Sequence, residues 1–207
     1  IWRDLLDNPA IDPLLESLIG NPDLRHRRDR QNRTAKPTYR LDHINVHTHV
    51  AKGFEGGILH GGWNGVSGFY RYDNGTLFNG LTTVSFELYD TTGNDGGFAC
   101  IPGSHKANIP APRRWLDLSK GVHPSITRVC ANAGDAIIFT EALTHGTLPW
   151  HVDDPRSTVF YKFSPHTLSW SADFYDQEDF VGYEDMSERK LALIEKPNAR
   201  YPRRPKS

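Results

Sequence analysis

Short stretches rich in β-branched and aromatic residues recur along the chain, and turn-forming residues separate them. In the clearest of them, Leu41–Val50, apolar and polar side chains alternate as in a strand with two different faces. The other strand candidates are Phe69–Tyr72, Leu81–Tyr89, Phe98–Ile101, Ile126–Cys130, Ala136–Thr140 and Thr158–Ser164. Many short strands with Gly-rich connections predict a mainly β fold, an antiparallel sandwich or barrel, with the jelly roll as the best single guess.

Helical patterns flank this β region. Residues 1–20 carry apolar stripes at helical spacing, with Asp12 as an N-cap and Pro13 at the first helical position. A second short helix is expected over Ser187–Glu195, before Pro197. We therefore expect one domain over residues 1–207. Its parts are a helical lead-in and basic loop (1–36), a jelly-roll core (37–166) and a C-terminal extension (167–207).

Composition excludes several classes of function. The 24 Lys and Arg residues balance 25 Asp and Glu, so the net charge of −1 provides no overall field for holding nucleic acid or an anionic membrane. Two cysteines exclude a disulfide scaffold, and no apolar run is long enough for a membrane span. Without a signal-peptide pattern we expect a cytoplasmic protein, and its oligomeric state stays open. The Arg-rich stretch 25–33 is interpreted as solvated surface, with a phosphorylated or CoA-linked substrate as the weaker alternative.

Histidine is the residue type that composition singles out, with ten imidazoles in 207 residues. Imidazole is a common ligand of borderline metals, so metal chemistry is expected before any motif is considered. His43, His47 and His49 share the polar face of a predicted strand with Asn45, and ligands two residues apart on a strand can reach one zinc ion. The alternative, which we favour, is a polar face that lines a pocket or meets solvent.

A second group of residues points to a different metal site. His60 is followed by two glycines, His145 lies just after a predicted strand, and Arg156 opens the next strand. An antiparallel hairpin would bring Arg156 back beside His145. A guanidinium beside a metal can grip a carboxylate with two parallel hydrogen bonds. Two histidines and such an arginine outline a non-haem iron site that uses a keto-acid co-substrate.

Several longer motifs resemble the phytanoyl-CoA dioxygenase family. They include a loop with the letters PGSHK, a strand with the letters GDAIIF, and a His-x10-Arg pair. In order along residues 40–166 they are Asp95–Lys106, Gly134–Phe139, Thr144–Pro149, Arg156 and Tyr161–Pro165. Because these motifs occur together and in order, the resemblance is specific.

The resemblance implies a double-stranded β-helix (jelly-roll) oxygenase that binds Fe(II) and 2-oxoglutarate and consumes O2. His60 matches the first metal-binding histidine of the family, His145 the distal one, and Arg156 the clamp for the far carboxylate of 2-oxoglutarate. Thr158 shares the strand face of Arg156 and could add a hydroxyl, and Asn45 is a weaker candidate for the same co-substrate. The metal and the co-substrate carry the reactivity, while protein groups position and tune them.

One position departs from the family pattern. Where the family has a metal-binding Asp, this sequence has Gly62, which offers no side chain. Related halogenases resemble this sequence in having Gly or Ala there, which leaves room for a chloride ion. Alternatively, a carboxylate elsewhere substitutes, with Glu55, Asp73 and Glu87 nearest in sequence, or the site is degenerate and holds metal weakly.

These observations predict an Fe(II)/2-oxoglutarate-dependent oxygenase. It would act on a small organic substrate by oxidative decarboxylation of 2-oxoglutarate and hydrogen abstraction, leading to hydroxylation. Two alternatives stay open. One is a halogenase-type variant that uses the position of Gly62 for chloride, and the other is a non-catalytic jelly-roll binding module.

Overall fold

The computed structural model describes residues 2–19, 36–49, 52–53, 55–62 and 68–200. The strands are β1 (Tyr39–His49), β2 (Tyr70–Asp73), β3 (Thr76–Asn79), β4 (Thr82–Glu87), β5 (Gly97–Cys100), β6 (Thr127–Arg128), β7 (Ala136–Thr140), β8 (His145–Leu148) and β9 (Arg156–Pro165). The α-helices are α1 (Asp12–Leu18), α3 (Arg113–Leu116) and α4 (Glu188–Leu193). Short 3-10 helices cover Trp2–Leu5, Ser104–Lys106, Leu118–Lys120 and Gln177–Phe180.

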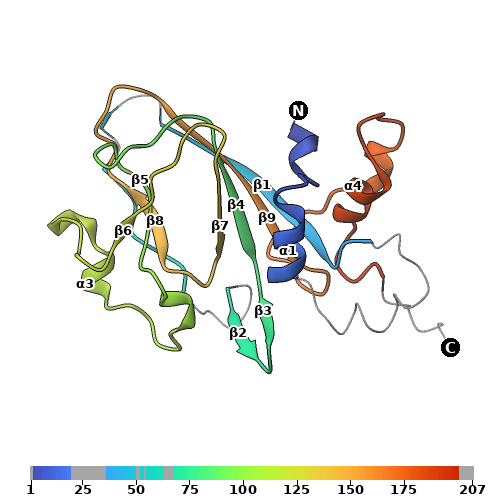
Figure 1. Ribbon diagram of the computed structural model, residues 1–207, viewed down its shortest axis with the longest axis horizontal. Helices are drawn as coiled ribbons and strands as arrows, with labels where there is room; N and C mark the ends of the chain where they lie inside the picture. Colours follow the sequence, from blue (N-terminus) through green and yellow to red (C-terminus); the bar gives the residue numbers. More distant parts are fainter. Residues whose placement is uncertain (1, 20–35, 50–51, 54, 63–67, 201–207) are drawn as a thin grey trace.

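Antiparallel pairing builds a large sheet in the order β1-β9-β4-β7. A smaller sheet has the order β6-β5-β8, and β2 with β3 forms a separate hairpin. Figure 1 shows the small sheet standing apart from the large one, with the hairpin below both. This arrangement of antiparallel sheets confirms the predicted mainly β jelly-roll class.

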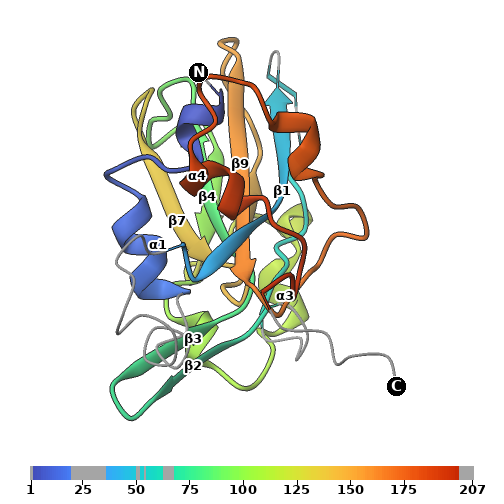
Figure 2. The same ribbon diagram turned by 90° about the vertical axis from the view of Figure 1, so that its right-hand side faces the viewer.

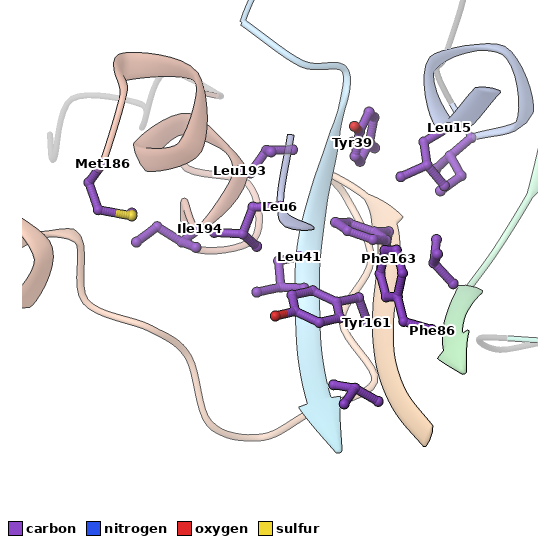
Figure 3. Packing of buried hydrophobic residues seen from close by; sticks show 13 residues of the cluster. Leu6, Leu15, Tyr39, Leu41, Phe86, Tyr161, Phe163, Met186, Leu193 and Ile194 are labelled. Carbon is purple, nitrogen blue, oxygen red and sulfur yellow. The ribbon is translucent and has the colours of Figure 1, made fainter. Parts of the chain in front are cut away.

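The main hydrophobic core covers one face of the large sheet. Alternate residues of β9, among them Val159, Tyr161 and Phe163, point to this face and are buried. The lead-in and the C-terminal helix pack against them, so that Leu15 and Leu193 belong to the same cluster (Figure 3). Figure 2 shows α1 and α4 in front of this sheet. We call this the outer face.

The opposite face of the large sheet, the inner face, carries the intervening residues of β9. These are Arg156, Thr158, Phe160 and Lys162, and the β1 residues paired with them run from His49 to His43. Most of these inward positions are polar, whereas the outer positions of the same strand are apolar. The period-2 pattern therefore directs one set of side chains to the core and the other toward the small sheet.

Several local predictions needed correction. The hairpin expected between His145 and Arg156 is absent, since β8 pairs with β5 in the small sheet and β9 pairs with β1 and β4 in the large one. Strands β3 and β8 were not predicted. Asp12 is the first residue of α1 rather than its cap, and Ile11 is the cap.

Among the helices that the structure describes, none combines the length and apolar character that crossing a membrane requires. The Arg-rich stretch 25–33, considered above for phosphate recognition, lies outside the described residues.

Candidate functional site

His60 and His145 lie side by side, although 85 residues separate them in the sequence. Residues 57–60 run beside β8, and the backbone N–H groups of His60 and His145 each donate to the other's carbonyl at 2.8 Å. The two imidazole centroids are 4.4 Å apart. Because an antiparallel bridge places directly opposed side chains on the same side of a sheet, both rings point the same way.

The chain turn before β8 fixes the orientation of the His145 ring. Its Nδ1 donates a hydrogen bond to the carbonyl of Leu143 at 2.7 Å, because a carbonyl can only accept. This leaves the lone pair of a neutral ring on Nε2, the arrangement typical of metal-binding histidines. Burial lowers the pKa of His145 to about 4 and outweighs the opposing effect of the Glu141 charge. The ring is therefore neutral near pH 7.

Gly61 makes the close packing behind this ring possible. A Cβ at this position would lie 2.2 Å from the carbonyl oxygen of Leu143, the oxygen that orients His145. The backbone also has a φ of +98°, which L side chains rarely adopt. The neighbouring Gly62 has a φ of +88°, but a Cβ there meets no described atom within 4 Å. Gly61 is therefore required by packing, and Gly62 by backbone conformation alone.

A carboxylate that the sequence analysis missed stands next to the two rings. Glu141 directly follows β7, and its Oε2 lies 3.6 Å from Nε2 of His145. Its Oε1 accepts a hydrogen bond from Thr83 and an ion pair from Lys162 at 2.8 Å. Burial raises the pKa of Glu141, but the charge of Lys162 and the hydrogen bonds outweigh it and lower the pKa overall. The signal in the sequence was a carboxylate four residues before His145.

A small cavity of about 50 Å³ opens beside these groups. His60 and His145 line it together with Asn45, His47 and Phe160 from the inner face. Burial and the charges of Arg156 and Lys162 lower the pKa of His47, so this ring is also held neutral. Of the polar residues of β1, Asn45 and His47 thus line a pocket, whereas His43 and His49 are not among its lining residues. His43 bonds Asp42 and stacks on Trp170, and among the described residues the three histidines of β1 form no group of potential metal ligands.

Arg156 forms a second charged cluster further along the inner face. Its guanidinium is 1% exposed, and Nη2 lies 3.4 Å from Oε2 of Glu87. Glu87 also accepts hydrogen bonds from Thr158 and Ser85, at 2.6 and 2.8 Å. Within the part of the chain that the structure describes, Nε and Nη1 of Arg156 are buried without a partner. Buried donors without partners are costly, so this guanidinium is suited to binding an anionic group.

The carboxylates suggested by the sequence as substitutes for position 62 lie elsewhere. Glu55 is exposed, and Asp73 is at an exposed hairpin beside Arg71. Glu87 is buried, but its oxygens already bind Ser85, Thr158 and Arg156. Glu141 is the carboxylate that the fold brings to the histidine pair.

The sequence profile of the family described as phytanoyl-CoA dioxygenase (PhyH) matches residues 2–158, which is more than half of the chain. The chain belongs to the phytanoyl-CoA dioxygenase family. No curated protein matches its sequence significantly. This match confirms the family resemblance that the motifs at residues 95–106 and 134–165 indicated.

Solved structures similar to this member of the phytanoyl-CoA dioxygenase family include crystal structures of HygX from Streptomyces hygroscopicus. With nickel and 2-oxoglutarate bound, HygX is 23% identical, with a TM-score of 0.56, covering 70% of this chain and 64% of HygX. HygX with nickel, 2-oxoglutarate and hygromycin B bound is 20% identical, with a TM-score of 0.64, and the match covers 81% of this chain and 66% of HygX. Iron-bound HygX is 24% identical, with a TM-score of 0.53, and the match covers 64% of this chain and 61% of HygX. This chain spans about two thirds of HygX at most in these three comparisons, and at this identity they establish the fold.

Proposed function

We propose that this protein is an Fe(II)- and 2-oxoglutarate-dependent oxygenase that hydroxylates a small organic substrate. The observation that carries the proposal is the buried guanidinium of Arg156, whose Nε and Nη1 have no partner among the described residues. It shares the inner face with residues that surround the His60–His145 pair. A cation site and an anion site on one face fit a metal and a dicarboxylate bound together.

The histidine pair fits an iron ion. His145 presents Nε2, because the Leu143 carbonyl holds its Nδ1 proton, and the His60 ring lies beside it. Both residues would serve as metal ligands, in agreement with the iron or nickel present in the HygX structures. When bound, iron and 2-oxoglutarate together supply the oxidising power, converting O2 and the keto acid to succinate, CO2 and an oxidised substrate.

The second cluster fits the far carboxylate of 2-oxoglutarate. Arg156 would donate to it from Nη1–H, and Glu87 holds the guanidinium in place through Nη2. Thr158 fixes Glu87 through its hydroxyl, so its part in this binding is to position Arg156. Asn45 lines the cavity near the histidines, and its Nδ2–H2 group, 3.5 Å from Nε2 of His47, would be its donor to an oxygen of the co-substrate, since its Oδ1 can only accept.

Anaerobic titration with Fe(II) and 2-oxoglutarate tests this proposal. We expect a visible charge-transfer band that needs both components and is lost in His145→Gln, with the His123→Gln variant as a control outside the site. In air, the wild type should convert 2-oxoglutarate to succinate. A wild-type protein that binds neither component would overturn the proposal and favour a non-catalytic binding module.

Halogenation is the second candidate, favoured by the open space around position 62. A Cβ there meets no described atom within 4 Å, so an anion could enter. Chloride should then change the charge-transfer band of the wild type, and Gly62→Asp should abolish that response. A band insensitive to chloride in both proteins would exclude this candidate and leave hydroxylation.

A further inference from the structure

Glu141 occupies a position from which it can reach the proposed metal. Among the described residues, His60, Glu141 and His145 form the one group of three potential metal ligands whose donor atoms lie within 4.8 Å of one another. Adjacent ligands of one ion, at bond lengths of about 2.1 Å, stand about 3 Å apart. The 3.6 Å between Oε2 of Glu141 and Nε2 of His145 is close to this spacing. Small side-chain rotations would complete it.

The fold holds Glu141 there through both backbone and side chain. Its N–H donates to the carbonyl of Leu81 at 2.9 Å, which continues the pairing of β7 beyond Thr140. A tight turn then brings the chain back into β8, with Leu143 N–H bonded to the carbonyl of Thr140. Glu141 and His145 therefore sit on the two sides of one turn, and a four-residue separation suffices to place both at the same ion.

The two oxygens of Glu141 have different surroundings. Thr83 and Lys162 both contact Oε1, whereas Oε2 faces Nε2 of His145. The side chain is 13% exposed, so a negative charge is kept in a mostly buried place next to two histidines. Such a charge is stabilised strongly by a divalent cation.

We propose that Glu141 supplies the carboxylate ligand that Gly62 lacks, so that His60, His145 and Glu141 form a two-histidine, one-carboxylate metal site. Lys162 and Thr83 hold the second oxygen of Glu141 and thereby orient the ligand. This inference rests on the proposed function, because it names the third ligand of the same ion. It places the anionic ligand four residues before the distal histidine, instead of two residues after the first one.

Metal affinity tests the assignment without any need for turnover. Titration with Co(II) alone should show that Glu141→Gln and His145→Gln each weaken binding by more than about 100-fold, beyond the usual effect of a residue that only supports a ligand. Glu195→Gln removes a buried carboxylate from a different ion-pair cluster and should stay within twofold of the wild type. In infrared difference spectra, Co(II) should shift a carboxylate stretch in the wild type and not in E141Q.

Rescue provides the second measurement. In Glu141→Ala, added formate should restore Co(II) affinity by tenfold or more, while formate has no such effect on the wild type. An E141Q affinity within threefold of the wild type, or equal formate effects in both proteins, would overturn the role of Glu141. Equal Co(II) affinity of the wild type and H145Q would instead overturn the iron site itself.

Discussion

Two buried glutamates on the inner face of the large sheet have opposite surroundings. Glu87 has both oxygens engaged, by Ser85 on one side and by Thr158 and Arg156 on the other. Glu141 has its contacts to Thr83 and Lys162 on one oxygen, and the other faces His145. Beside Glu87, Arg156 has two nitrogens without a partner among the described residues. Glu141 instead has one oxygen, Oε2, that faces the ring of His145.

In the site proposed above, this difference separates an anion-binding end from a cation-binding end. Arg156 would offer Nη1–H to a carboxylate, and Glu141 would offer Oε2 to a metal. Phe160 lies between Thr158 and Lys162 on β9 and so separates the two clusters. Because side chains alternate along a strand, one face of the sheet thus carries both proposed sites, one for a metal and one for a dicarboxylate.

At the cation-binding end, Gly61 packs closely against the carbonyl of Leu143, and its substitution has the largest expected effect on stability. Gly61→Ala should lower the free energy of unfolding by about 3 kcal/mol, because the new Cβ collides with the Leu143 carbonyl and the backbone is left-handed. Gly62→Ala has the strained backbone without the collision and should cost about 1 kcal/mol. Denaturant unfolding measures both, and equal losses would show that Leu143 does not constrain this turn.

A third polar cluster, formed by His166, Glu195 and Arg200, lies just beyond the end of β9. Burial, with the charge of Arg200, lowers the pKa of His166 to about 4, so the ring is neutral in the folded protein. The unfolded chain binds its proton near pH 6.5, so this residue should reduce stability by roughly 2 to 3 kcal/mol as pH falls from 6.5 to 4. Urea unfolding at several pH values in this range should show that the free energy of unfolding falls less steeply with decreasing pH in His166→Gln than in the wild type. A substitution of the exposed His151, His151→Gln, serves as control.

The anion-binding end can be tested by replacing the planar guanidinium of Arg156 with another cation. Arg156→Lys keeps the charge but loses the planar fork, so affinity for 2-oxoglutarate should fall by about 10- to 100-fold. Affinity for Co(II) alone should be unchanged, because Arg156 contacts the other cluster. Isothermal titration measures both, and Arg71→Lys on the exposed hairpin is the matched control. Loss of metal binding in Arg156→Lys would show that the two ends are not independent.

The smallest effect sharpens the comparison between the two glutamates. Glu87→Gln should change the affinity for Co(II) alone by less than about twofold, since the amide can keep contacts to Ser85 and Thr158. Glu141→Gln, a chemically identical change on the same face, is expected to lose more than about 100-fold. If both substitutions weakened Co(II) binding equally, general loss of buried negative charge would explain the effect.

Much of the architecture could be predicted from local sequence patterns. Alternation predicted β1, with polar side chains on one face, and the strands β4, β7 and β9 lie within or overlap the predicted ranges. The motifs indicated the family, which the match over residues 2–158 confirms. The hairpin between His145 and Arg156 was wrong, because a return to the neighbouring strand is only one of the connections that a jelly roll uses.

For the site, the sequence named His60, His145 and Arg156, and their roles as ligands stay predictions. The sequence does not single out Glu141, because it lies far along the chain from position 62, whereas Glu55, Asp73 and Glu87 are nearer. Only the turn between β7 and β8 shows that Glu141, four positions before His145, faces the ring of that histidine. Side-chain direction after a strand depends on the turn geometry, which one-dimensional spacing does not contain.

By itself, the sequence determined which residue types could bind a metal and a carboxylate, since period-2 alternation and short motifs are local properties. It also fixed that Gly62 cannot be a side-chain ligand. Only the tertiary structure decided that two distant histidines pair across a bridge, that Arg156 is left with unpartnered donors, and that Glu141 meets His145. The histidine bridge joins segments 85 residues apart in the sequence, and the contact of Glu141 with His145 depends on the turn between β7 and β8, so neither follows from a local residue pattern.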